Sequence, residues 1–243
     1  MEQFGEVWKT KELSKVFLEG VRSSLPLASE QIDIMLRIIQ TEMPNINRFL
    51  DLGCGDGVLG RAIMAQYPNA GGVFLDLSEP MLNTAKQKIG ERSNACFVLQ
   101  DFSNEDWVHA VENKAPFDVI VSGFAIHHQP DIRKKALYQE IFDLLRPGGL
   151  FLHLEHVASA SKWVSSISDE LFVDSLYSFH KQAGSTKTRA EIADKFFYRP
   201  DKASNILAPV EVQCEWLKES GFINVDCFFK VFEVALFGGM KPN

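Results

Sequence analysis

The sequence has few cysteines, and they lie far apart. The four cysteines, Cys54, Cys96, Cys214 and Cys227, form no CxxC pair. Closely spaced cysteines are the signature of disulfide frameworks and of many metal sites, so this pattern favours neither. We interpret the four residues as reduced thiols of a cytoplasmic protein.

The chain also lacks a long hydrophobic run and an excess of basic residues. No segment approaches the ~20 apolar residues that a membrane-spanning helix needs. The first eight residues contain no basic region followed by an apolar one, so we expect no secretory signal and no membrane. The net charge of −7, from 25 Lys and Arg against 32 Asp and Glu, argues against a broad nucleic-acid-binding face.

What the sequence does contain is typical of a soluble globular protein. Hydrophobic residues make up 46% and charged residues 23% of the 243 positions, and the 19 phenylalanines provide for a large core. This length is near the upper end for one hydrophobic core, so we predict a single domain.

Short apolar runs alternate with helical patterns, which predicts an α/β fold with a mostly parallel sheet. Two further runs, 222–227 and 231–237, are joined by a linker that permits only a hairpin, so the last strand should be antiparallel. Residues 157–208 contain scattered aromatic residues and no strand pattern, which indicates a helical insertion. The five predicted parallel strands are 48–52, 72–76, 96–99, 117–121 and 150–154. The predicted parts are an N-terminal helical cover (1–44), a core (45–156), a helical lid (157–208) and a final helix with the strand pair (209–243).

A glycine loop follows the first strand. In the segment Asp51-Leu52-Gly53-Cys54-Gly55-Asp56-Gly57, the glycines allow a ligand to approach the backbone, and the following helix offers free N–H groups. Residues 55–60 also match the dinucleotide pattern GxGxxG, with Asp76 at the offset of a ribose-binding acid. An NAD-binding oxidoreductase is therefore a remote alternative. Asp51 opposes it, because this acid would repel a pyrophosphate but attract an ammonium or sulfonium group.

Read from Asp51, the sequence resembles class I S-adenosylmethionine-dependent methyltransferases from about residue 45 to 238. The resemblance implies a Rossmann-like, doubly wound sheet of seven strands, S-adenosylmethionine as cofactor and S-adenosylhomocysteine as product. It also implies that Asp51, Gly53 and Gly55 hold the amino-acid part of the cofactor and that Asp76 binds the ribose. The residues implied for the adenine and the strand edge are Leu77, Met81, Asp101, Phe102 and Ser122. Helix capping is the other explanation for Asp76 and Asp101.

Histidines and a carboxylate follow the fourth and fifth strands. His127, His128, Glu155 and His156 are candidate catalytic residues, because these strand ends should open on the same crevice. They are consistent with polar wall residues, a general base or a metal site. We predict no metal, because the sulfonium is already activated and His156 points to the other face from Glu155.

The insertion reverses the sign of charge locally, with six basic residues against three acids between 177 and 202. These cations form either a solvated helix face or a site for an anionic substrate group, for which Arg199 and Tyr198 are the candidates. The insertion and C-terminal third are similar to the carboxy-S-adenosylmethionine synthase branch, which serves tRNA wobble-uridine modification. The ordinary methyltransferase form of the glycine loop departs from that branch.

We therefore expect a methyltransferase that acts on a small molecule, and an anionic group on that molecule is one option. The synthase is the alternative function. The aromatic lid favours a closed pocket over a polymer groove, so we expect no nucleic-acid partner. The oligomeric state stays open, with a homodimer as one alternative.

Overall fold

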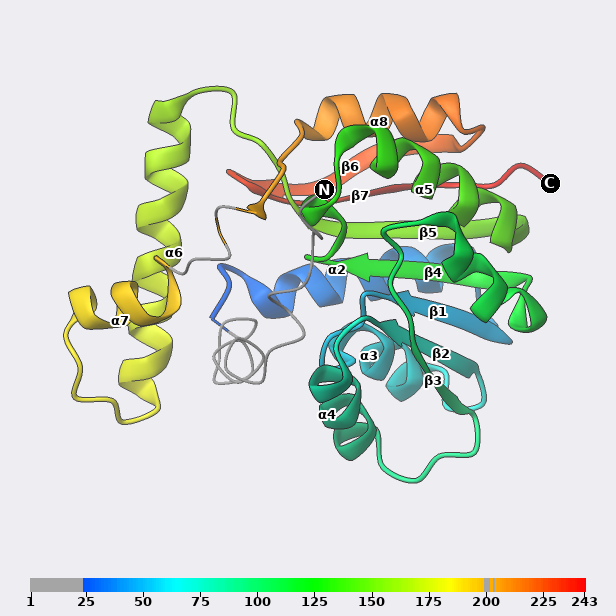
Figure 1. Cartoon of the computed structure of the whole chain (residues 1–243), viewed down its shortest axis with the longest axis horizontal. Helices are drawn as coiled ribbons and strands as arrows, with labels where there is room; N and C mark the ends of the chain where they lie inside the picture. The colour runs from blue at the N-terminus through cyan, green and yellow to red at the C-terminus, as the bar shows by residue number, and fades with distance from the viewer. Residues whose placement is uncertain (1–23, 199–201, 203) are drawn as a thin grey trace.

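The computed structural model describes residues 24–198, 202 and 204–243. One seven-stranded sheet forms its centre, with strand order β3-β2-β1-β4-β5-β7-β6 (Figure 1). The five parallel strands are β1 (Arg48–Leu52), β2 (Gly71–Asp76), β3 (Ala95–Leu99), β4 (Phe117–Gly123) and β5 (Leu145–His156). A hairpin of β6 (Ile223–Val231) and β7 (Val234–Met240) completes the sheet, and β7 runs antiparallel to β5. The predicted fold class is confirmed.

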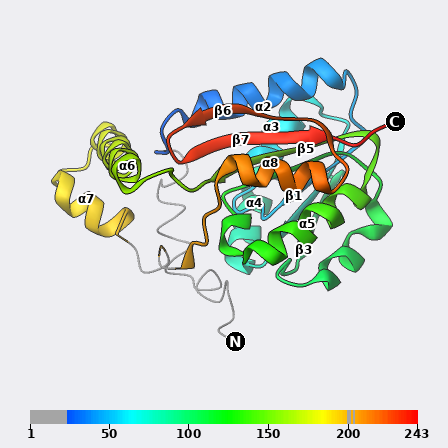
Figure 2. The same cartoon turned by 90° about the horizontal axis from the view of Figure 1, so that it is seen from above.

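Helices cover both faces of the sheet, because successive side chains of a strand point to opposite sides. Phe49 and Phe74 belong to the core on one face, and Leu50 and Leu75 belong to the core on the other. Figure 2 shows α2 and α5 on opposite sides of the sheet. The first layer contains α2 (Ala28–Glu42), α3 (Val58–Gln66) and α4 (Glu79–Ile89), and the second contains α5 (Asp131–Leu144) and α8 (Val210–Glu219).

The chain between β5 and α8 forms a helical pair with a small core of its own. The pair consists of α6 (Lys162–Gln182) and α7 (Arg189–Phe196), which stand to one side of the sheet in both views (Figures 1 and 2). Val173, Leu176 and Ile192 form part of their shared core. This agrees with the predicted insertion after the fifth strand, and its closure as a lid stays a prediction.

The chain order reverses between β1 and β4, which lie side by side in the sheet. Connections from the two strands leave in opposite directions there, so a crevice opens at the strands' carboxyl ends.

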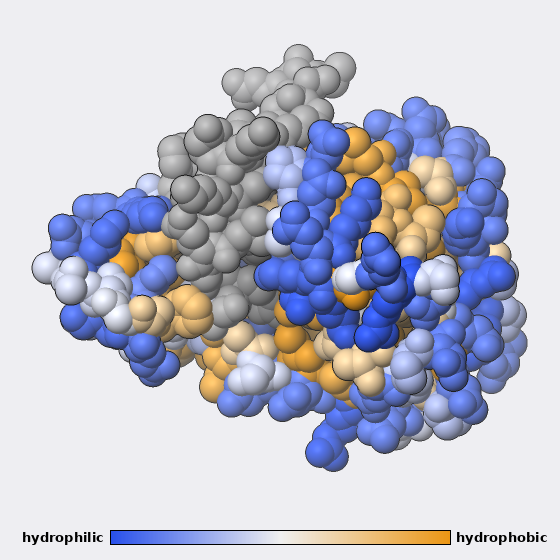
Figure 3. Space-filling view, turned by 90° about the horizontal axis from the view of Figure 1, so that it is seen from below, coloured by the Kyte–Doolittle hydropathy of each residue, from blue (hydrophilic) through white to orange (hydrophobic). Residues whose placement is uncertain are grey.

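Of the predicted N-terminal cover, α2 is described, and residues 1–23 lie outside the described part. Within the residues that the structure describes, no helix is long and apolar enough to cross a membrane. Figure 3 shows one face on which hydrophobic groups appear in patches among hydrophilic ones.

We expect Phe74→Ala to destabilise the protein by about 3–5 kcal/mol, because truncation of a buried phenylalanine leaves a cavity. The Phe74 ring is fully buried between Phe49, at 5.7 Å between ring centroids, and Phe97, at 5.3 Å. Urea unfolding measures the change. Leu99→Ala is the matched control, because this strand residue is 56% exposed and should change stability by less than ~0.5 kcal/mol.

Candidate active site

The glycine loop joins β1 to α3 through three residues with positive φ. Gly53, Gly55 and Gly57 have φ values of 68°, 54° and 76°, which L side chains rarely adopt. A Cβ atom on Gly53 would collide with the Cβ of Ala125, whereas one on Gly55 would meet nothing within 4 Å. Gly53 is thus required by packing, and Gly55 presents its backbone to open space.

Asp51 lies beneath this loop as a buried carboxylate. The backbone N–H of Gly60 donates to its Oδ2 at 2.8 Å, and the residue is 1% exposed. Burial, reinforced by the negative charges of Asp56 and Asp76, raises the pKa of Asp51 to about 8. A cation placed against this carboxylate would favour its ionised form.

Asp76 ends β2 and connects the loop to α4. Its Oδ2 accepts a hydrogen bond from the backbone N–H of Gly55, and its Oδ1 accepts one from that of Ser78, both at 2.8 Å. Burial raises the pKa of Asp76 to about 6. Asp76 therefore holds the turn before α4 and caps none of the N–H groups of the helix, and the same side chain lines a cavity.

A first cavity of about 840 Å³, open solvent at its mouth included, lies at the ends of β1, β2 and β4. Two predicted cofactor residues are not among its lining. Asp101 accepts a hydrogen bond from the Ser103 N–H, and Ser122 is buried with its hydroxyl donating to the Leu52 carbonyl. The structure brings the others together around the cavity: Asp51, Gly53, Gly55, Asp76, Leu77, Met81 and Phe102.

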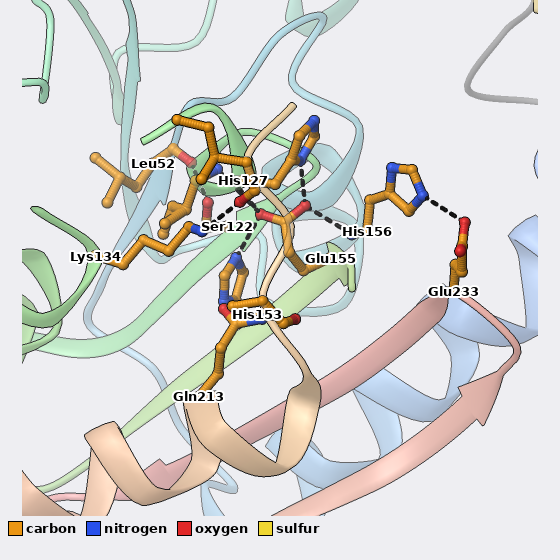
Figure 4. Close-up of polar contacts among 12 residues, drawn as sticks. Leu52, Ser122, His127, Lys134, His153, Glu155, His156, Gln213 and Glu233 are labelled. Carbon is orange, nitrogen blue, oxygen red and sulfur yellow. Dashed lines mark hydrogen bonds and ion pairs between the residues drawn. The ribbon is translucent and has the colours of Figure 1, made fainter. Parts of the chain in front are cut away.

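Glu155 is the centre of the predicted catalytic cluster. Its fully buried carboxylate accepts hydrogen bonds from the backbone N–H groups of Ile126, His127 and His156 at 2.7–3.0 Å. It also contacts the Nδ1 of His127 at 2.5 Å and the Nε2 of His153 at 2.9 Å (Figure 4). Burial alone would raise the pKa of Glu155, but its interactions with these two histidines hold it well below its usual range.

The other two predicted catalytic histidines have different surroundings. The Nε2 of His156 lies 3.0 Å from the Oε2 of Glu233, which lies in the turn between β6 and β7 (Figure 4). The ring of His128 lies 4.0 Å from that of His127 between centroids. Within the described residues, no group of three His, Cys, Asp or Glu side chains is arranged to hold a metal ion. The expectation of metal-free turnover stays a prediction.

A second cavity of about 860 Å³, with open solvent again included, lies between these histidines and the helical pair. Phe124 and His128 line both cavities, so the two adjoin at the segment after β4. His127, His156 and Glu233 contribute polar groups to the second one, and the remaining lining is largely apolar. The geometry offers two neighbouring compartments with histidines between them.

Of the two predicted substrate residues, the structure describes one. Arg199 lies outside the described residues. Tyr198 is 64% exposed and is not among the cavity's lining residues. Lys202, another of the six basic residues counted in this segment, does line the second cavity, with its Nζ 3.5 Å from the Oδ1 of Asp169.

Sequence reasoning also missed two buried polar residues behind the cluster. Tyr138 in α5 and Gln213 in α8 are 0% and 1% exposed, and their side chains are 2.7 Å apart. Each lies within a helical stripe of apolar residues. A polar residue within such a stripe is the signal that would have identified them.

Comparison with known proteins places the core in a recognised family. Residues 50–151 match the family model described as a methyltransferase domain. The carboxy-S-adenosyl-L-methionine synthase of Nautilia profundicola is 25% identical to this chain. The match covers 95% of this chain and 93% of that synthase. A malonyl-[acyl-carrier protein] O-methyltransferase of Ilyobacter polytropus is 26% identical over 58% of this chain and 52% of that protein.

Solved structures agree on the fold. Human N-acetylserotonin methyltransferase, solved in complex with S-adenosylmethionine, matches 100% of this chain with a TM-score of 0.63 and 15% identity. The CurJ carbon methyltransferase matches 96% with a TM-score of 0.62 and 15% identity. This chain spans only 59% and 62% of the length of these two structures. The family match, the sheet order and the acidic glycine loop together identify residues 50–151 as the core of a class I S-adenosylmethionine-dependent methyltransferase domain.

Proposed function

We propose that this chain transfers the methyl group of S-adenosylmethionine to a small molecule bound in the second cavity. The observation that carries the proposal is the adjoining of the two cavities at Phe124 and His128. A cofactor in the first cavity would direct its methyl group toward an acceptor in the second. Such alignment is the main requirement of a reaction whose electrophile is already activated.

The first cavity suits this cofactor in charge and in shape. Asp51 would face the ammonium group, and the open side of Gly55 would admit the amino-acid part. Asp76 still has lone pairs available for the ribose hydroxyls, and Met81 and Phe102 provide apolar walls for a ring. A pyrophosphate would oppose the ionisation of Asp51 and Asp76, whereas the ammonium and sulfonium groups of S-adenosylmethionine favour it. These contacts therefore support S-adenosylmethionine over the dinucleotide.

A second candidate is carboxy-S-adenosylmethionine synthesis. It is favoured by the synthase of Nautilia profundicola and that of Nitratiruptor sp., which match 95% of this chain, helical pair included, at 25% and 27% identity. The glycine loop 53–57 is of the ordinary methyltransferase form, which favours methyl transfer. In either reaction the second cavity would hold the co-substrate.

One experiment separates these two candidates. The purified protein is incubated with methyl-labelled S-adenosylmethionine and a pool of small metabolites, and the products are analysed by mass spectrometry. Methyl transfer yields S-adenosylhomocysteine and a labelled acceptor, in equal amounts and without added metal. A cofactor gaining the mass of a carboxyl group from a carboxylate donor would instead establish the synthase. The absence of both products would refute both candidates.

We expect Asp76→Ala to weaken S-adenosylhomocysteine binding by about 30- to 1000-fold. The loss of charge-assisted ribose contacts in a closed site costs about 2–4 kcal/mol. Isothermal titration calorimetry measures the affinity. Asp106→Ala, which removes an exposed acid outside the cavity, is the matched control. Unchanged affinity in Asp76→Ala with an intact fold would show that this acid only holds the turn before α4.

Cofactor binding should depend on pH through Asp51. With a pKa of about 8, this carboxyl is mostly protonated in the free protein at pH 7, whereas the ammonium of the ligand favours the carboxylate. Binding should therefore release a proton, and affinity should rise by up to about tenfold per pH unit from pH 6 to 8. Titrations in buffers of different ionisation enthalpy count the released proton. Asp51→Asn should abolish the release, and proton uptake on binding would contradict the assignment.

If the acceptor is anionic, Arg199→Ala should raise its Michaelis constant by tens-fold or more and leave cofactor affinity unchanged. Truncation of one partner of a buried charge pair costs about 2–5 kcal/mol, whereas an exposed arginine costs less than ~0.5 kcal/mol. Arg189→Ala is the matched control, because this arginine pairs with Asp174 and Glu170 within the helical pair. Equal behaviour of the two variants would remove the support for an anionic acceptor.

A further inference from the structure

Behind the second cavity, four buried side chains from three elements form a continuous polar chain. Gln213 of α8 contacts Tyr138 of α5, which contacts His153 of β5, which contacts Glu155 of the same strand. All four are at most 1% exposed. Buried polar groups must satisfy their hydrogen bonds internally, so the direction of each bond can be deduced from its neighbours.

At the Gln213 end of the chain, the direction of the hydrogen bonds is fixed by the amide group. The Nε2 of Gln213 donates to the Ala208 carbonyl at 3.0 Å, which places its Oε1 toward the Tyr138 hydroxyl at 2.7 Å. An amide oxygen only accepts, so the single proton of Tyr138 is committed to Gln213. The Nδ1 of His153 lies 3.2 Å from the same hydroxyl. This nitrogen must then be the donor, and it carries a proton.

At the Glu155 end of the chain, the direction of the hydrogen bond is fixed by the carboxylate. Three backbone N–H groups donate to the Glu155 carboxylate, which keeps it ionised even when buried. The Nε2 of His153, 2.9 Å from Oε2, must therefore donate to it. Both ring nitrogens of His153 are donors, which is the arrangement of an imidazolium.

We propose that Gln213, Tyr138 and Glu155 hold His153 as a buried imidazolium, and that this leaves His127 as a neutral general base for an acceptor that must lose a proton. The inference rests on the proposed function and specifies its acceptor class: a hydroxyl, a thiol or an ammonium group. Glu155, His153, Tyr138 and Gln213 are positioning residues, because they act through His127.

The assignment of His127 follows from the same network. Its Nδ1 faces Glu155 at 2.5 Å and donates to it, so in the neutral ring of His127 the lone pair lies on Nε2. Within the described residues Nε2 has no hydrogen-bond partner, and His127 lines the second cavity. Figure 4 shows His127 and His153 on different sides of the Glu155 carboxylate. The imidazolium of His153 balances the carboxylate, so His127 is not held in its protonated form.

The proposed step balances as follows. An ammonium acceptor first loses a proton to the Nε2 of His127, which frees its lone pair, whereas a hydroxyl or thiol loses its proton to the same nitrogen as it attacks. The acceptor's lone pair forms a bond to the methyl carbon, and the carbon–sulfur bond breaks with its electron pair passing to sulfur. The sulfonium becomes the neutral thioether of S-adenosylhomocysteine, and the proton on His127 then passes to solvent.

Other titratable groups face His127 from the elements around it and contribute to any pH dependence. They are His128 beside it in the 3₁₀ helix Ile126–His128, Glu155 and His156 on β5, Glu233 behind His156, and Asp169 and Lys202 across the cavity. His153 is faced by Tyr138, Glu155 and Gln213, and otherwise by the rings of Phe151 and Phe237. The test must therefore resolve individual histidines.

The test is nitrogen NMR of the full-length chain with ¹⁵N-labelled histidines, assigned by His127→Gln and His153→Gln. At pH 7.5 we expect two protonated ring nitrogens for His153, and a protonated Nδ1 with an unprotonated Nε2 for His127. A neutral His153 in the wild type would overturn the proposal. This measurement needs no acceptor and is independent of catalytic activity.

Two variants should shift the titration of His127 in the same direction by different means. Tyr138→Phe removes the acceptor of the His153 Nδ1 proton, and Gln213→Leu frees the Tyr138 hydroxyl to donate to that nitrogen. Either change favours neutral His153, so Glu155 becomes uncompensated and the midpoint of the His127 titration should rise by about one pH unit, a tenfold change in proton affinity. An unchanged or lower midpoint in a folded variant would contradict the relay. Tyr67→Phe, which removes the hydroxyl contact to the Met43 carbonyl, is the matched control and should leave the midpoint unchanged.

Activity separates this inference from the proposed function. With an acceptor from the metabolite screen, His127→Gln should lower the rate of methyl transfer by about 10²- to 10⁴-fold, and His109→Gln, an exposed control, should not. In Tyr138→Phe the rising limb of the pH–rate profile should shift to higher pH, by the same amount as the His127 midpoint measured by NMR. Absence of methyl transfer with the NMR result intact would refute the function alone. Normal transfer in His127→Gln would refute the general base.

Discussion

The arrangement of the site depends on one buried carboxylate. Glu155 accepts hydrogen bonds from three backbone N–H groups, two of them in the segment after β4. Burial of an ionised carboxylate is costly unless it is surrounded by donors, and removal of those donors would leave the full desolvation cost. The segment after β4 is therefore held in one conformation by a side chain of the neighbouring strand. Both cavities include residues of that segment, so their relative position follows from this interaction.

The sheet makes this interaction possible. β4 and β5 are parallel neighbours, with Ser122 paired to His153 and Gly123 to Leu154. Their carboxyl ends therefore reach the same edge, and the residue that follows Leu154 lies beside the chain that leaves Gly123. The Phe124 N–H donates to the Leu154 carbonyl at 2.9 Å, which continues the ladder by one step. Glu155 then replaces the backbone as the acceptor for the next N–H groups.

Much of this architecture could be predicted from the sequence, because it depends on local patterns. Apolar runs and helical periods indicated the parallel strands, and the glycine turn indicated the crevice beside Asp51. The placement of Ser122 could not be predicted from its position at the end of β4. The pleat points its hydroxyl inward to the Leu52 carbonyl, and one residue of register decides between the core and the crevice. Asp101 shows a different limit. Its Oδ1 accepts from the Ser103 N–H two residues further on, and the sequence does not decide between this local turn and contact with a ligand.

The polar chain behind His127 depends on contacts between distant parts of the sequence, so neither spacing nor composition predicts it. Tyr138 and Gln213 are 75 residues apart, and each lies on an apolar helix face that packs against the sheet. Their pairing becomes necessary only when α5 and α8 lie side by side, because each hydroxyl or amide would otherwise be buried without a partner.

The same chain connects the site to both stems of the helical pair. The Ala208 carbonyl accepts from Gln213 and from the Ala158 N–H at 3.0 Å, and the Ile206 N–H donates to the His127 carbonyl at 2.8 Å. The residues that enter and leave the insertion are thus bonded to each other and to the histidine segment. By contrast, α6 and α7 are stabilised by their own core. The stems of the helical pair, and not its core, therefore fix the position of the histidine segment.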